Sequence, residues 1–138
     1  MKKTYFILLA DRKQAIYFLV TGRAVMKKDI LLDPSVPQRV KHGDDTWDAQ
    51  DKIYRHIEDH LHRHLTKVAD NAKKFVDGEK FDGVVIGGHK QLFSKLIEHL
   101  PPKISQQVVA TFTAELKVPD NAILEKAESV IRSVEMKE

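Results

Sequence analysis

The sequence predicts an α/β fold, built on a mixed five-stranded sheet with helices on both faces. Three strand-like runs at residues 4–10, 14–20 and 23–32 open the chain, separated by gaps of hairpin length. Two strand–helix units follow, and the first contains the β-branched run Val84 to Ile86, which is typical of a strand covered on both faces. A long segment with helical spacing of its apolar residues lies between these two halves.

The first half reads as an antiparallel meander of three strands. Residues 11–13 separate the first two runs, and Thr21-Gly22 offers the turn that leads into the third. In the third run the apolar residues Ala24, Met26, Ile30 and Leu32 fall on a roughly alternating face, as a half-buried strand requires.

The second half begins with a long helix, expected from about Asp48 to Val76, because apolar residues recur along it every three or four positions. Residues 83–86 then form a buried strand. A helix over residues 91–99 follows, and Pro101-Pro102 ends it.

The last third of the chain contains a helical turn at residues 104–107, a strand over residues 108–116 and a final helix that starts at Pro119-Asp120. Strands in consecutive strand–helix units pair in parallel. The natural assembly adds these units beside the first strand, which gives the strand order 3-2-1-4-5. This is the ribonuclease H-like arrangement.

Composition limits the class of protein. A chain of 138 residues corresponds to a single domain, here residues 1–138. The longest apolar runs, at residues 7–10 and 16–20, are far shorter than a membrane span, and the absence of cysteine excludes disulfides and thiolate metal sites. We therefore expect a cytoplasmic protein without membrane contact. The net charge of +3 permits binding to nucleic acid without requiring it.

Three segments carry a resemblance to a known family. FDGVVIGG at residues 81–88, the helix with Leu92, Phe93 and Leu96, and LPPKISQQVVATFTAEL at residues 100–116 resemble the middle domain of the archaeal and eukaryotic peptide release factors. The bacterial single-chain relatives of that family are the most similar. The resemblance extends roughly from Thr4 to Val134, and it implies a module that associates with the ribosome or with structured RNA in translation termination, rescue or hibernation.

One motif of that family is missing. Full-length release factors carry Gly-Gly-Gln in the loop between the third strand and the long helix, whereas the equivalent loop here, Asp33 to Asp51, contains Gly43 as its only glycine. The resemblance therefore implies a non-catalytic module without peptidyl-tRNA hydrolysis and without a cofactor.

Gly87-Gly88-His89-Lys90 is the first candidate binding segment. A glycine turn at the start of a helix presents free amides to an anion, and Lys90 adds positive charge. A tight strand-to-helix turn without a ligand explains the same residues, and the spacing matches no nucleotide-binding motif.

The 33–51 loop and the start of the long helix form the second candidate. Basic residues neutralise phosphates and a tryptophan can stack on an unpaired base. Several aspartates in the same loop oppose this interpretation by repelling phosphate. The candidate RNA-binding residues are Arg39, Lys41, His42, Trp47, Lys52 and Arg55.

Three histidines, His56, His60 and His64, lie at four-residue steps along the long helix and therefore share one stripe. Two histidines at this spacing can bind zinc, but the order His-Glu-x-x-His is absent. We expect a solvated or RNA-facing polar stripe, with a metal site as the alternative.

A metal-dependent hydrolase or nuclease is the alternative function that the fold suggests. Such enzymes hold two metal ions between carboxylates, and Asp11, Glu58 and Glu125 or Glu128 are the candidates. The predicted fourth strand ends in glycines instead of a carboxylate, which leaves the set incomplete. Pairing of two copies through the edge of the third strand is a further alternative.

Overall fold

The computed structural model describes the main chain of residues 3–32 and 47–137 and the side chains of residues 3–32 and 59–136. Its sheet has the order β3-β2-β1-β4-β5, which confirms the predicted order. Strands β1 (Thr4–Ala10), β2 (Gln14–Thr21) and β3 (Ala24–Leu32) form an antiparallel meander. Strand β4 (Gly83–Gly88) pairs in parallel with β1, and β5 (Val108–Thr113) pairs in parallel with β4.

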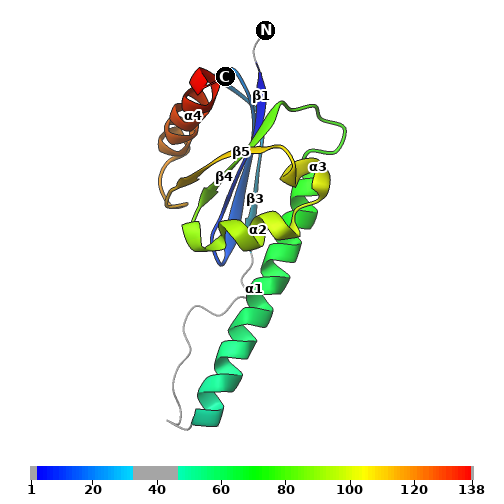
Figure 1. Cartoon of the computed structure of the whole chain (residues 1–138), viewed down its shortest axis with the longest axis vertical. Coiled ribbons are helices and arrows are strands. Elements are labelled where there is room, and N and C mark those ends of the chain that lie inside the picture. The colour runs from blue at the N-terminus through cyan, green and yellow to red at the C-terminus, as the bar shows by residue number, and fades with distance from the viewer. Residues whose placement is uncertain (1–2, 33–46, 138) are drawn as a thin grey trace.

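Helices cover both faces of this sheet (Figure 1). On one face lie the long helix α1 (Trp47–Phe75), the short turn η1 (Lys90–Leu92) with α2 (Phe93–His99), and α3 (Pro102–Ser105). Helix α4 (Asp120–Lys137) packs on the other face. The hydrophobic core therefore forms two layers, one on each face of the sheet.

Strand β1 runs through the centre of the sheet and contributes to both layers of the core. Because side chains alternate along a strand, Phe6 and Leu8 point toward α1 and α2, whereas Tyr5 and Ile7 point toward α4. Each of these four side chains is buried. The uninterrupted apolar run of β1 reflects this position, since a central strand covered on both faces has no polar side.

Two predicted strand boundaries differ from the structure by more than one residue. Strand β4 extends to Gly88, because Gly87 and Gly88 still pair with β1. Strand β5 ends at Thr113, short of the predicted residue 116. Thr113 pairs with Gly88, the last residue of β4, so beyond it the ladder has no partner strand in register.

Only the second half of helix α1 lies over the sheet, and its first half extends beyond the end of the sheet (Figure 1). Among its described side chains, Leu61 is the first that belongs to the core. From there Leu65, Val68, Ala72 and Phe75 follow at helical spacing and cover the sheet. No helix in the described part of the chain is long and apolar enough to cross a membrane.

Candidate functional site

The Gly87–Lys90 segment is not an open loop. Gly87 and Gly88 are buried inside β4, and the amide of His89 lies 3.4 Å from the carbonyl oxygen of Ala10, to which it donates. The helix that follows begins with the three-residue turn η1 and continues as the seven-residue α2. At this edge the groups that face solvent are the side chains of His89 and Lys90.

Close packing explains both glycines. A Cβ atom on Gly87 would lie 2.7 Å from the ring of Phe112, and one on Gly88 would lie 2.3 Å from the carbonyl oxygen of Ala10. Gly88 also has a φ angle of 109°, which side chains rarely tolerate. The backbone therefore lies very close to a neighbour at both glycines, and that neighbour is the protein's own chain. Anion binding by this segment stays a prediction.

The second candidate set falls outside the described part of the molecule. Arg39, Lys41 and His42 lie outside the described residues. Trp47, Lys52 and Arg55 belong to α1, which begins at Trp47, and their side chains are also outside the description. The structure places the backbone of these last three on the half of α1 that extends past the sheet (Figure 1).

The predicted solvated histidine stripe is wrong for His64, which is completely buried. Its Nε2 lies 2.8 Å from the carbonyl oxygen of Asp11 and donates a hydrogen bond to it. His64 lies between Leu61 and Leu65 on the face of α1 that packs on the core, so the predicted stripe of histidines is not solvated at this position. His60 is half-buried, and the side chain of His56 is outside the described residues.

A different pair of histidines is in contact. His99 Nε2 lies 3.0 Å from His62 Nδ1, and His99 Nδ1 lies 2.6 Å from the carbonyl oxygen of Lys95. The pair links α2 to α1. Within the described residues, no group of three His, Asp or Glu side chains could hold a metal ion.

Of the carboxylates proposed for a nuclease, Asp11 and Glu128 have partners elsewhere in the chain. Asp11 Oδ1 accepts hydrogen bonds from the amides of Lys13 and Gln14, both at 2.8 Å, and so closes the β1–β2 turn. Glu128 forms ion pairs with two arginines, and Glu125 is exposed on α4. The side chain of Glu58 is outside the described residues. The described members of this set are therefore not gathered at one point.

Charge is distributed unequally between the two helical layers. The described side chains of α1, η1, α2 and α3 include seven Lys or Arg and three Asp or Glu, whereas those of α4 include two and four. All seven cations of the first layer are exposed: Arg63, Lys67, Lys73, Lys74, Lys90, Lys95 and Lys103. Of the two helical layers, the α1–α3 layer is therefore the one with an excess of positive charge among its described side chains.

The comparisons with known proteins agree with this fold. Residues 2–132 match the family described as "Bacterial archaeo-eukaryotic release factor family 10". The chain belongs to this release factor family. Among curated proteins, none matches the sequence.

Solved structures share the fold of this family 10 chain. The archaeal translation termination factor aRF1 superposes with a TM-score of 0.60 at 17% identity, over 96% of this chain and 40% of that one. An archaeal protein superposes with a TM-score of 0.61 at 17% identity, over 93% and 34% of the two chains. The family 10 chain thus spans less than half of the length of either protein.

The release factor loop that holds Gly-Gly-Gln would correspond to the predicted loop at residues 33–51. The structure corrects its end, because residues 47–51 already belong to α1. The sequence of this family 10 chain contains no such tripeptide anywhere, since its one Gly-Gly pair, Gly87-Gly88, is followed by His89. That pair also lies across the sheet from β3, at the end of β4. Family membership and the missing motif are therefore both established from the sequence.

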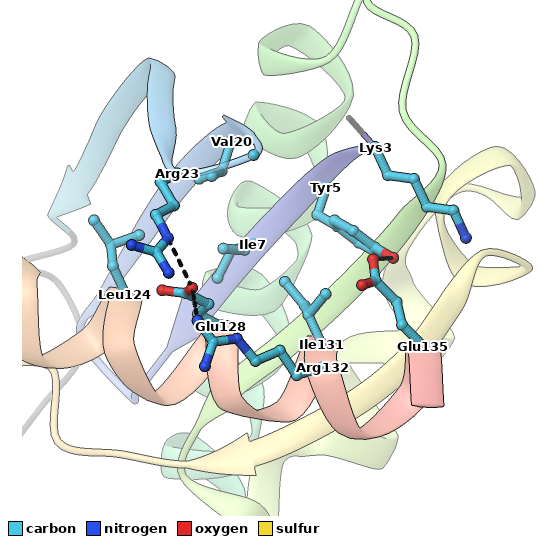
Figure 2. Close-up of a pocket in the computed structure, with 11 residues that line it drawn as sticks. Lys3, Tyr5, Ile7, Val20, Arg23, Leu124, Glu128, Ile131, Arg132 and Glu135 are labelled. Carbon is cyan, nitrogen blue, oxygen red and sulfur yellow. Dashed lines mark hydrogen bonds and ion pairs between the residues drawn. The ribbon is translucent and has the colours of Figure 1, made fainter. Parts of the chain in front are cut away.

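The structure of this family 10 chain has a hollow between α4 and the sheet, which the sequence did not predict (Figure 2). It brings together Tyr5 from β1, Arg23 from the β2–β3 turn, and Glu128, Arg132 and Glu135 from α4. Tyr5 and Glu135 are 130 positions apart in the chain, yet the tyrosine hydroxyl donates to the Glu135 carboxylate at 2.9 Å. No local motif marks such a site, because only the packing of α4 creates it.

The edge of the sheet at β3 is also open in the described structure. Most of its side chains are exposed, and Met26 and Leu32 are 64% and 68% exposed. The predicted alternating face of this strand is thus not covered within the described chain. Pairing of two copies through β3 stays a prediction.

Proposed function

We propose that this chain is a non-catalytic module that binds the ribosome or structured RNA, and that it acts in translation termination, rescue or hibernation without hydrolysing peptidyl-tRNA. Membership of a release factor family supports the translational setting. The similarity of its fold to a protein named as a translation termination factor points the same way. This role assigns the protein to the cytoplasm.

The observation that carries the proposal is the positive α1–α3 layer. Phosphates are the most abundant charged groups on any ribosomal RNA surface, and clustered Lys and Arg side chains supply most of the affinity for them. Seven exposed cations lie on this layer against three carboxylates, whereas α4 on the opposite face has more acids than bases. RNA is therefore expected to approach the α1–α3 face.

The projecting half of α1 supports the same orientation. Its backbone extends past the sheet (Figure 1). The candidate residues Trp47, Lys52 and Arg55 all lie on this half, and Arg39, Lys41 and His42 precede it in the chain. In the proposal, these residues and the α1–α3 cations contact one continuous stretch of RNA. In the same proposal, His89 and Lys90, which follow Gly87 and Gly88, extend this contact.

The absence of hydrolysis rests on the missing tripeptide, for which the sequence offers no substitute. One experiment, with ribosomes that carry peptidyl-tRNA, tests both the absence of hydrolysis and the nuclease alternative. We expect ribosomes loaded with peptidyl-tRNA to retain their peptide after incubation with the protein. Peptide release would refute the non-catalytic role, and RNA cleavage that needs Mg²⁺ and stops with EDTA would replace it with the nuclease.

The binding proposal is tested by co-sedimentation with ribosomes at increasing salt. Two charge-reversal variants of equal net charge distinguish binding through the α1–α3 layer from attraction that depends only on the total charge of the protein. Arg63→Glu with Lys95→Glu alters the α1–α3 layer, whereas Lys117→Glu with Lys126→Glu alters exposed lysines beyond it. We expect the first variant to remain in the supernatant and the second to sediment like the wild type.

Either of two results would contradict the binding proposal. Equal loss in both variants would mean that only total charge matters. A wild-type protein that stays in the supernatant at low salt would mean that it does not bind ribosomes.

A further inference from the structure

The hollow between α4 and the sheet has the size and lining of a ligand site (Figure 2). Its volume is about 670 Å³, within the range of roughly 300–1,000 Å³ that small-molecule pockets occupy. It lies on the opposite face of the sheet from the α1–α3 layer, so it is independent of the RNA surface proposed above.

The floor of the hollow is apolar and belongs to the core. Ile7 and Val20 reach it from β1 and β2, and Leu124 and Ile131 face them from α4 (Figure 2). The ring of Tyr5 lies beside Ile7 and adds a flat aromatic surface. Such a floor favours a hydrophobic or aromatic body over a strongly hydrated ion.

One end of the hollow is positively charged. Arg23 Nε lies 3.3 Å from Glu128 Oε1, and Arg132 Nη2 lies 2.6 Å from the same oxygen. Two guanidinium groups thus share a single carboxylate, which leaves one positive charge in excess. Each guanidinium has five N–H donors in a planar fork, more than one carboxylate oxygen can accept, and this fork fits carboxylates and phosphates well.

Stability alone gives a poor account of this cluster. Arg23 and Arg132 are 81% and 60% exposed, and exposed ion pairs contribute little to stability because solvent screens them. Weakly held arginines can turn from Glu128 to another anion at little cost. At the other end of the hollow, Tyr5 binds Glu135 and Lys3 also lines the wall, so charges of both signs occur there, whereas the Arg23–Arg132 end has an excess of positive charge.

We propose that this hollow binds a small amphiphilic anion, with its apolar body against Ile7, Val20 and Ile131 and its carboxylate or phosphate on Arg23 and Arg132. The apolar floor selects the body, and the paired guanidinium groups select the anionic head. Neither a bare inorganic ion nor a neutral amphiphile satisfies both halves of the site.

The test uses the fluorescence of anilinonaphthalene sulfonate, an aromatic anion that becomes bright in apolar sites, with the chain of 138 residues. Arg23→Ala with Arg132→Ala removes the head-group contacts, and Lys117→Ala with Lys126→Ala removes the same charge outside the hollow. We expect the first variant to bind the probe at least about tenfold more weakly and the second to bind it like the wild type. Thermal unfolding of each variant is measured alongside, because the probe also brightens on partly unfolded protein.

Competition identifies the head group. We expect decanoate or decyl phosphate to displace the probe, and whichever displaces it at the lower concentration identifies the preferred anion. Decanol and inorganic phosphate should leave the probe bound. Equal binding by the two folded double variants, or displacement by inorganic phosphate as strong as by the amphiphiles, would overturn the proposal. Ribosome binding would be unaffected by either result, because it depends on the other face.

Discussion

His64 Nε2 donates a hydrogen bond of 2.8 Å to the carbonyl oxygen of Asp11, and so joins α1 to the β1–β2 turn. The imidazole is completely buried between α1 and the sheet. Asp11 in turn closes its own hairpin by accepting the amides of Lys13 and Gln14. This buried side chain is therefore one of the contacts that hold the long helix to the first hairpin.

The first prediction concerns this contact. Replacement of His64 by alanine leaves a cavity and an unsatisfied carbonyl, so we expect the free energy of unfolding to fall by about 2–4 kcal/mol. Arg63→Ala, at the adjacent exposed position, should change it by less than about 0.5 kcal/mol. Urea denaturation of both variants measures the difference. A His64→Ala protein as stable as the wild type would show that this hydrogen bond is not structurally important.

The second prediction separates two costs of replacing a glycine. Gly88 and Gly78 both have positive φ angles, 109° and 76°, but a Cβ on Gly88 meets the Ala10 carbonyl oxygen at 2.3 Å whereas one on Gly78 meets nothing within 4 Å. Gly78→Ala should therefore cost only the conformational strain, about 1–2 kcal/mol. We expect Gly88→Ala to cost more than about 4 kcal/mol or to prevent folding. Thermal melting compares the two variants, and equal losses would contradict the importance of the close contact.

The third prediction concerns the hydroxyl of Tyr17, which is buried and donates to the carbonyl oxygen of Val68 at 2.8 Å. Burial raises the pKa of Tyr17 well above its ordinary value, because the charged phenolate loses its hydration. The folded protein therefore retains this proton at a pH where the unfolded chain has lost it. Stability from this group is complete below about pH 10 and falls as the pH rises above that value.

Tyr17→Phe tests both parts of this prediction. We expect it to lower the free energy of unfolding at neutral pH by about 1–2 kcal/mol, since the Val68 carbonyl loses its donor. Above pH 10 the variant should lose stability less steeply with pH than the wild type does. Denaturation curves between neutral and strongly alkaline pH supply both values. Parallel curves for the two proteins would show that Tyr17 does not titrate differently on folding.

The fourth prediction concerns how strongly the proposed RNA binding depends on salt concentration. Each cation that neutralises a phosphate contributes about 0.7–0.9 to the slope of log affinity against log salt concentration. Arg63→Ala with Lys95→Ala should therefore reduce that slope by about 1.4–1.8. Lys117→Ala with Lys126→Ala should leave it unchanged. Binding to ribosomes or to a structured ribosomal RNA fragment at several salt concentrations gives the slopes.

The fold was largely predictable, because each element leaves a local pattern in the sequence. The β-branched run at Val84 to Ile86 and the helical spacing of Leu65, Val68 and Ala72 both depend on residues close together in the chain. The predicted strand ends were wrong where a residue far away in the chain determines where the strand ends. Strand β5 ends at Thr113 because β4 ends at Gly88, and nothing in the sequence near Thr113 indicates this.

The candidate sites were less predictable for the same reason. His64 has the spacing of a surface histidine stripe, and only the packing of α1 on the β1–β2 turn shows that it is buried. The hollow on the α4 face depends on Tyr5 and Glu135, which are 130 positions apart. A pattern read along the chain cannot bring such residues together.

By itself, the sequence determined the α/β class, the strand order, the release factor family and the lack of Gly-Gly-Gln, because periodicity, motif and composition are properties of neighbouring residues. The tertiary structure alone decided that Gly87 and Gly88 face the protein's own chain, that His64 is buried, and that Arg23 and Arg132 meet at Glu128. These relations depend on which surfaces come into contact when the helices pack on the sheet. The free energy of that packing comes from segments far apart in the chain.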